Sequence, residues 1–383
     1  MEPVELLEAL VGMDSIFPDE ADLAHFLAKE LERCGFQVRM QRFGNRYNVL
    51  AERAGSTGQG TGNRKPLLLY SHMDTVPAYG YGDRDPFRLE ERDGKLFGLG
   101  AYDMKAGLAA IVQAVDAVRS GRPLKVMFVS DEEANSSGCN EAVKAGFVKD
   151  AGFALATEIS DVHDMDESTR TIMLGRRGRV QYQVDVPGKS FHAARAEQGI
   201  SALTQAAKIA IELERMELPT HPKLSGGSQF VRSFSSGSAS LSLPDSATLL
   251  VDRHLVFPEN AESARKDIQS VIDGLYDNGQ VREADGKRAV VSVKPRETPY
   301  LLPFVTPEGE QEVQRLSSTI REVLGAEPRY NYGMSVADEN LLAMQGVPTA
   351  SFGPIGGGEH SAGEWVSKKS YLELIEVLKA FIS

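Results

Sequence analysis

The sequence is poor in cysteine, and it has neither an excess of positive charge nor a long apolar run. Two cysteines among 383 residues, Cys34 and Cys139, are too few for a disulfide framework or a thiolate zinc site. The formal net charge of −12 argues against a general affinity for nucleic acid or for an anionic membrane. No apolar run approaches the length of a membrane span, so no membrane protein is expected.

The first residues also lack the basic side chains with which a secretory signal begins. The segment MEPVELLEALVGM carries acidic residues instead and is typical of an amphipathic helix. Together with the scarcity of cysteine, this favours a reducing, cytoplasmic location. Hydrophobic residues make up 42% and charged residues 25%, as in ordinary globular proteins, and the length allows two or three domains.

Residues 1–176 alternate between strand and helix patterns. Buried-type strands are indicated by PLLLY (66–70), PLKVMFVS (123–130) and AGFALATE (151–158). A helix, DMKAGLAAIVQAVDAVRSG (103–121), lies between the first two. This alternation predicts a largely parallel sheet covered by helices.

Residues 177–294 follow a different plan. RVQYQVDVPG has the alternation of a strand with one solvent-facing side, and the segment as a whole predicts the order β-α-β-β-α-β of a ferredoxin-like unit. The α/β pattern resumes over residues 295–383. We therefore predict an α/β catalytic domain formed by residues 1–176 and 295–383, with an inserted α+β domain, 177–294, that acts as a lid or in dimerisation.

Acidic and histidine side chains follow the ends of the predicted strands or lie in the loops between them. Each has an ordinary explanation; Asp103, for example, suits the N-cap of its helix. In a parallel sheet, however, these strand ends open at one edge, and carboxylates crowded there need protons or cations to coexist. The residues concerned are His72, Asp74, Asp103, Asp131, Glu132, Glu133, Glu158 and His360.

Histidine and carboxylate ligands without thiolates suit divalent ions such as Zn²⁺, Co²⁺ or Mn²⁺. A carboxylate that bridges two ions about 3.5–4 Å apart would create a hydrolytic site. Two glycine-rich segments are poor nucleotide sites: GLGAYD has Asp103 where a dinucleotide fingerprint needs its third glycine, and GPIGGGEHSAG lacks the lysine of a phosphate loop.

Several segments resemble, in order and spacing, the M20 metallopeptidase family. They are SHMDTVPA, GLGAYDMKAGLAA, SDEEANSSG, ATE, SFHAARAEQGISA, LPDSATLLVDRHL and FGPIGGGEHSAGEWV. The family includes acetylornithine deacetylase, succinyl-diaminopimelate desuccinylase, aminoacylase and glutamate carboxypeptidases. The resemblance implies two divalent ions per chain, preferably zinc, with cobalt or manganese as alternatives. The ligands it implies are Asp103 as the bridge, His72 and Glu158 on one ion, and Glu133 and His360 on the other.

The resemblance also implies roles beyond metal binding. Glu132 corresponds to the general base, and Asp74 to the carboxylate that orients the imidazole of His72. His192 corresponds to a histidine that stabilises the oxyanion from the partner subunit of a homodimer. Arg253 corresponds to a lid arginine that binds a substrate carboxylate. The last two also have ordinary explanations, as a surface histidine and as an arginine paired with Asp252 or another acid.

The chain departs from the family at two positions, because Ser201 and Leu241 stand where many members have asparagine. The acyl group or side chain of the substrate therefore stays open. We expect hydrolysis of an amide bond in a small peptide or N-acyl amino acid with a free carboxylate. The alternatives are an aminopeptidase or dipeptidase, which would need a free amine, and a catalytically silent binding protein; Glu132 beside a complete ligand set argues against the silent protein.

Overall fold

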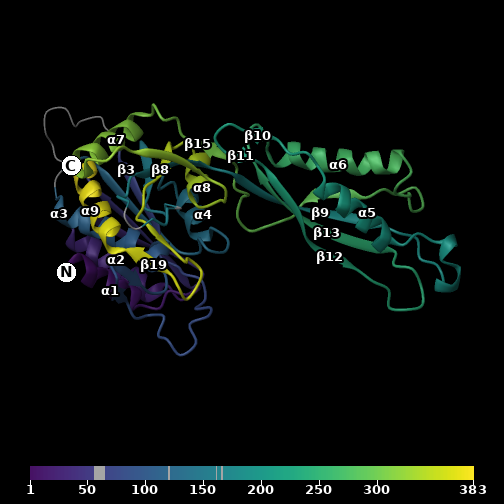
Figure 1. Ribbon diagram of the computed structural model, residues 1–383, viewed down its shortest axis with the longest axis horizontal. Coiled ribbons are helices and arrows are strands. Elements are labelled where there is room, and N and C mark those ends of the chain that lie inside the picture. Colours follow the sequence, from purple (N-terminus) through teal and green to yellow (C-terminus); the bar gives the residue numbers. More distant parts are fainter. Residues whose placement is uncertain (56–64, 120, 161, 165–166) are drawn as a thin grey trace. The chain divides into compact units, whose positions relative to one another are not determined.

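The computed structural model describes residues 1–55, 65–119, 121–160, 162–164 and 167–383, and it divides into two compact units (Figure 1). Unit 1 comprises Met1–Gly175, Val305–Tyr332 and Ala337–Ser383, and unit 2 comprises Arg176–Phe304 and Gly333–Val336. Within the described residues, no helix combines the length and the apolar character needed to cross a membrane.

The predicted second boundary, at residue 294, is ten residues too early. Residues 295–304 belong to unit 2 because they are bonded to it: the Arg179 amide donates to the Leu301 carbonyl at 2.8 Å, and the Tyr300 hydroxyl to the Lys294 carbonyl at 2.7 Å. The segment has no strong strand or helix pattern, so the sequence did not indicate to which unit it belongs.

Unit 1 is built around a nine-stranded mixed sheet. Its strand order is β1 (Gln37–Phe43), β2 (Arg46–Arg53), β6 (Leu124–Val129), β3 (Leu67–His72), β7 (Phe153–Ala156), β17 (Thr349–Ser351), β8 (Thr171–Arg176) and β15 (Phe304–Val305), with β16 (Arg329–Gly333) also paired to β8. The four central strands, β6, β3, β7 and β17, run parallel, while β1 and β2 are antiparallel to their neighbours. The predicted α/β fold with a largely parallel central sheet is confirmed.

A smaller sheet in unit 1 carries the glycine-rich segment near the C-terminus. Its order is β18 (Gly356–Gly357), β19 (Trp365–Ser367), β5 (Lys95–Phe97) and β4 (Glu90–Arg92). The loop between β18 and β19 contains His360, so this sheet brings the end of the chain to the segment that follows β5.

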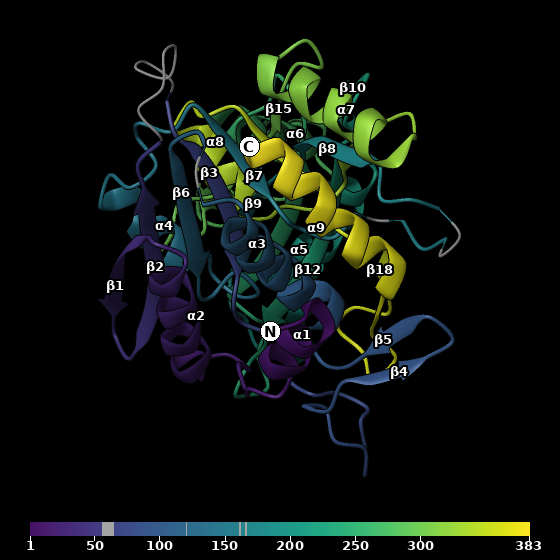
Figure 2. The same ribbon diagram turned by 90° about the vertical axis from the view of Figure 1, so that its left-hand side faces the viewer.

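Helices cover both faces of the large sheet. One layer contains α1 (Pro3–Val11), α2 (Ala21–Arg33), α3 (Ala106–Ala117), α7 (Gln311–Leu324) and α9 (Lys368–Ile382), and the other contains α4 (Ser137–Lys144) and α8 (Glu339–Met344). Figure 2 shows α3 and α9 side by side across the sheet. Successive side chains of β3 point to opposite faces of the sheet. Leu67 and Leu69 join the core beneath the first layer of helices, while the Tyr70 hydroxyl reaches Asp338, next to α8.

Unit 2 has the predicted ferredoxin-like topology. In chain order it contains β9 (Gly178–Pro187), α5 (Ala202–Glu214), β12 (Ser228–Ser236), β13 (Ser246–Leu255), α6 (Ala261–Asp277) and β14 (Val290–Val293), with a small hairpin of β10 (Thr220–His221) and β11 (Ser225–Gly226). The sheet order is β12-β13-β9-β14, all antiparallel, and α5 and α6 share one hydrophobic core with one face of this sheet.

Arg253 lies inside that core. It follows Val251 and precedes Leu255 on the helix-facing side of β13, and only 1% of it is exposed. Its guanidinium forms an ion pair with the buried Glu259 and lies 3.7 Å from Asp267. The cation is therefore compensated within unit 2.

We expect Arg253→Ala to lower the free energy of unfolding by about 3–5 kcal/mol, because it leaves the Glu259 carboxylate buried without its cation. Chemical denaturation of the variant measures this loss. Arg232→Ala is the matched control: Arg232 is half-exposed and lies 3.4 Å from Asp252, so its removal should cost no more than about 1 kcal/mol. Equal losses in the two variants would contradict a structural role for Arg253.

Candidate metal centre and active site

The site forms where parallel strands end side by side. In the register of the sheet His72, the last residue of β3, pairs with Val129, the last residue of β6. Tyr70 pairs with Ala156, so Glu158 lies level with His72 on the other side. The common edge brings these residues together because all three strands run in one direction.

Five predicted ligands meet at this edge in unit 1. Nitrogen or oxygen atoms of His72, Asp103 and Glu133 lie within 4.8 Å of one another, an arrangement able to hold a metal ion. The Glu158 carboxylate is 4.0 Å from His72 Nε2, and Glu133 Oε2 is 3.1 Å from His360 Nε2. The ligand set predicted from the sequence is thus assembled in one place.

The Asp103 carboxylate lies between two imidazoles. Its Oδ1 is 3.0 Å from His72 Nε2, and its Oδ2 is 3.5 Å from His360 Nε2. Each oxygen therefore faces a different histidine, which fits a carboxylate that bridges two ions. The ordinary alternative, Asp103 as a helix N-cap, is wrong: α3 begins at Ala106, and the side chain makes no capping bond there.

The electrostatics of the site follow from burial and crowding. Hydrogen bonds to Asp103 and Glu133 raise the pKa of His360 to about 10. Burial disfavours a charged His72, but Asp103, Asp74 and Glu158 outweigh it and hold the His72 pKa well above its ordinary value. Burial raises the pKa of Glu133. Without metal, protons on the imidazoles balance the carboxylates, and divalent cations would take their place.

Asp74 fixes the turn after β6. Its two carboxylate oxygens accept the backbone N–H groups of Glu132 and Glu133, each at 3.1 Å. His72 Nδ1 lies 3.0 Å from the Asp74 carbonyl oxygen and 3.7 Å from its carboxylate. Asp74 therefore contacts His72 mainly through its main chain, while its side chain holds the loop that carries Glu132.

The Glu132 carboxylate has no hydrogen-bond or ion-pair partner among the described residues, although its backbone is held by Asp74. Burial, reinforced by Asp338, Glu158 and Glu133, raises its pKa well above the ordinary value. An unpaired carboxylate of high proton affinity beside a ligand cluster has the properties of a general base.

Two supporting contacts were not predicted from the sequence. Asp131, just before Glu132, has a left-handed backbone (φ 73°), and its carboxylate lies 3.0 Å from Nη1 of Arg46, which also pairs with the buried Glu20. On the other side of the sheet, the Tyr70 hydroxyl donates to Asp338 at 2.8 Å. Both contacts join residues far apart in the chain, so no local pattern could have indicated them.

The remaining predicted site residues belong to unit 2. His192 is exposed, and its Nδ1 accepts from the Ala194 amide at 3.1 Å, which leaves Nε2 as the donor of the neutral ring. Leu241 is 78% exposed, and its carbonyl accepts from the Ala193 amide at 2.9 Å. Ser201 caps α5 by accepting from Thr204 N at 3.3 Å.

The predicted role of Arg253 as the clamp for a substrate carboxylate is wrong. The alternation of β13 turns this side chain toward α5 and α6, where Glu259 already occupies its guanidinium. The ordinary explanation, a pair with another acid, is the correct one. The next residue, His254, points to the opposite face of the sheet and is only partly buried.

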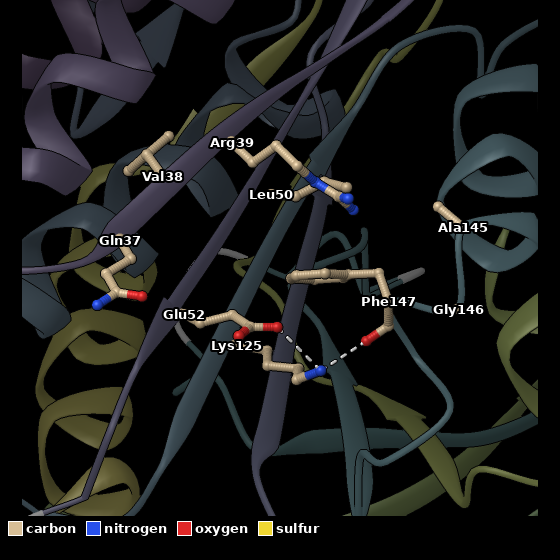
Figure 3. A pocket seen from close by; sticks show the side chains of 9 residues that line it. All are labelled: Gln37, Val38, Arg39, Leu50, Glu52, Lys125, Ala145, Gly146 and Phe147. Atoms are coloured by element: carbon tan, nitrogen blue, oxygen red, sulfur yellow. Dashed lines mark hydrogen bonds and ion pairs between the residues drawn. The ribbon is translucent and has the colours of Figure 1, made fainter.

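A cavity of about 460 Å³ elsewhere in unit 1 contains none of the predicted site residues. Figure 3 shows its lining. The buried cation there, Lys125, already donates to the Phe147 carbonyl at 2.8 Å and pairs with Glu52 at 3.1 Å. Lys125 is therefore compensated within the protein, whereas Arg39, the other cation of the lining, is exposed. The nine lining residues are Gln37, Val38, Arg39, Leu50, Glu52, Lys125, Ala145, Gly146 and Phe147.

Comparison with curated proteins finds relatives that match over their full length. The succinyl-diaminopimelate desuccinylase of Sulfurimonas denitrificans is 25% identical, covering 100% of this chain and 99% of that protein. The enzyme of the same name from Magnetococcus marinus is 26% identical, covering 100% and 98%.

Solved structures share the fold. The aminopeptidase PepT of Bacillus cereus superposes with a TM-score of 0.80 at 20% identity, covering 99% of this chain and 97% of that one. The M20 family metallo-carboxypeptidase Sso-CP2 of Sulfolobus solfataricus superposes with a TM-score of 0.74 at 17% identity, covering 100% and 98%.

The family model for peptidase family M20/M25/M40 matches residues 68–383, which include every residue of the site. The resemblance predicted from the sequence motifs is confirmed. The chain therefore belongs to peptidase family M20/M25/M40, and it is a metal-dependent hydrolase of C–N bonds in peptides or N-acyl amino acids.

Proposed function

We propose that the chain uses two divalent ions, preferably zinc, to hydrolyse the amide bond of a small peptide or N-acyl amino acid with a free carboxylate. The observation that carries this proposal is the position of Asp103, with one carboxylate oxygen toward His72 and the other toward His360. Glu158 and Glu133 complete a ligand set without sulfur, as zinc, cobalt or manganese would accept.

In this proposal the ions, when bound, supply Lewis acidity and lower the pKa of a water molecule toward 7. Glu132 takes a proton from that water and later passes it to the leaving amine. The raised pKa of Glu132 favours the acceptance of a proton by its carboxylate. Asp74 keeps Glu132 and the ligand Glu133 in place through their backbone N–H groups.

The preference for an acylated amine rests on the relatives named desuccinylase, which match over their full length. A free carboxylate on the substrate is suggested by those names. The alternative, an aminopeptidase or dipeptidase, has structural neighbours of high TM-score, but at 20% identity they are informative about the fold alone. The silent binding protein is disfavoured because Glu132 is retained although its carboxylate has no partner in the described part of the chain.

We further propose a homodimer formed through unit 2, in which His192 stabilises the oxyanion in the site of the partner subunit. The exposure of His192 and the donor left at its Nε2 support this role. The open face and edge strands of the four-stranded sheet in unit 2 offer a surface for a two-fold contact. A cytoplasmic location stays a prediction from the sequence.

The wild-type enzyme should hydrolyse N-acyl amino acids faster than the same compounds with an unblocked amine or an amidated carboxylate, as measured by kcat/KM. A preference for free amines would favour the aminopeptidase.

Glu132→Gln should lower kcat about 10²–10⁴-fold while metal remains bound, because the general base is lost. Glu133→Gln is the control, since it should weaken metal binding instead. Full turnover by Glu132→Gln would contradict the assignment of Glu132 as the general base.

Metal binding should strengthen as the pH rises from 6 to 8. The raised pKa values of His72 and His360 keep both imidazoles protonated in the metal-free protein, and these protons must leave before an ion can bind. Each proton released contributes a factor of about ten in affinity per pH unit. Competition with a chelator at several pH values measures the effect, and His25→Ala, on an exposed face of α2, serves as the control. An affinity independent of pH would contradict displacement of these protons.

The cross-subunit role of His192 predicts complementation. Mixing His192→Ala with Glu132→Gln subunits, after exchange, should restore about a quarter of wild-type sites, because half of the dimers are mixed and each has one intact site. Mixing Glu132→Gln with His72→Ala should restore nothing, since both residues belong to unit 1. An active wild-type monomer at the assay concentration would contradict the role.

A further inference from the structure

Glu364 is a buried carboxylate that binds the main chain around the bridging ligand. Only 2% of it is exposed. Its Oε2 accepts from the Gly100 amide at 2.9 Å, and its Oε1 accepts from the amides of Tyr102 and Asp103 at 2.9 and 3.0 Å. One side chain thus satisfies three N–H groups, including that of Asp103 itself.

The turn that carries Asp103 needs such a partner. Gly100 has a left-handed backbone (φ 69°), and a Cβ there would lie 2.3 Å from the Thr75 side chain. Asp103 lies outside the helical region, with φ −110° and ψ 92°, before α3 begins at Ala106. N–H groups at the start of a helix have no acceptor within the helix, and buried ones are costly when unbonded. Glu364 provides the missing acceptor: burial raises its pKa to about 8, and the three N–H groups oppose this shift because they stabilise the carboxylate.

Glu364 also belongs to the loop that carries His360. The Glu364 amide donates to the Ser361 carbonyl at 3.2 Å, and its carbonyl accepts from Gly98 N at 3.4 Å. The same short segment therefore holds His360, 3.5 Å from Asp103 Oδ2, and the carboxylate that fixes the Asp103 main chain. It connects two ligand-bearing segments that are more than 250 residues apart in the chain.

Lys105 fixes the same turn from the other side. It is 1% exposed, and its Nζ donates to the Met13 carbonyl, just after α1, at 2.9 Å. Burial lowers the pKa of Lys105 to about 7, and the carboxylate of Glu364 opposes this shift. The turn is therefore held at two points, but only Glu364 contacts Asp103 and shares a loop with His360.

We propose that Glu364 is a positioning residue of the metal centre, which holds Asp103 and His360 in register so that the site is preformed before an ion binds. This inference rests on the two-metal centre proposed above. Without Glu364, the turn at 100–103 would become ordered only when metal binds, and the free energy needed to order it would weaken the affinity for metal. Loss of groups that orient metal ligands typically weakens metal affinity about 10–100-fold.

The test compares Glu364→Gln with Glu312→Gln. The amide keeps the size of the side chain but removes the charge and turns an NH₂ toward backbone donors. Glu312, at the start of α7, is a partly buried carboxylate that pairs with Arg122 at 2.6 Å, before the first residue of β6. Because the site lies at the other end of β6, about 20 Å away along the strand, this control removes a carboxylate of unit 1 without touching the centre.

Both variants are stripped of metal, their thermal unfolding is recorded, and Zn²⁺ and Co²⁺ are titrated against a competing chelator. We expect Glu364→Gln to bind at least one ion about 10–100-fold more weakly than wild type and to change the absorption spectrum of bound Co²⁺. Glu312→Gln should lose stability while its metal affinity stays within about twofold of wild type.

Wild-type affinity in folded Glu364→Gln would overturn the proposal, because a purely structural carboxylate would affect unfolding alone. If Glu364→Gln does not fold, Glu364→Asp decides: it keeps the charge but is one methylene too short to reach all three N–H groups. Weaker metal binding by Glu364→Asp supports the proposal, and wild-type binding overturns it. A wild-type protein that binds no metal would overturn both the centre and the role of Glu364.

Discussion

The mutual repulsion of carboxylates at one edge of a sheet is the constraint on which the rest of the site depends. Asp103 and Glu133 have carboxylate oxygens within 4.8 Å of each other, Glu158 lies 4.0 Å from His72, and all three side chains are mostly withdrawn from water. They can coexist only when cations lie between them, and His72 and His360 are the two groups so placed. Because the negative charge of these carboxylates must be balanced inside the site, divalent ions can replace the protons on the two imidazoles.

Much of the surrounding structure keeps this crowded arrangement in one geometry. Asp74 holds the backbone of the two glutamates after β6, Arg46 holds Asp131 just before them, and Glu364 holds the turn of Asp103. The side chains of all three supports are themselves buried. Ordering the ligands through the fold, before any ion arrives, limits the entropy that binding must overcome.

Unit 2 illustrates how much depends on the face to which a side chain points. The motif that contains Arg253 suggested a residue presented to the substrate, yet strand alternation places it among Val251, Leu255 and the helices. A buried guanidinium with its own carboxylate is a structural element rather than a free binding group. The exposed His192 and Leu241, in contrast, lie on paired segments whose side chains are available for contact.

The sequence by itself determined the main outline. Buried-type strands, alternating strands and their spacing predicted an α/β domain with a ferredoxin-like insert, because hydrophobic periodicity reflects local secondary structure. The positions of His72, Glu133 and Glu158 after strands of one sheet edge were also predictable, whereas the resemblance to the family assigned the full ligand set, with Asp103 and His360.

Only the tertiary structure decided the contacts between distant segments: Arg46 with Asp131, Tyr70 with Asp338, and Glu364 with the Asp103 turn. It also decided that Arg253 pairs with the buried Glu259 and that residues 295–304 belong to unit 2. These features depend on which side chains meet after the chain has folded, and the local pattern of residues around each of them carries no record of its partner.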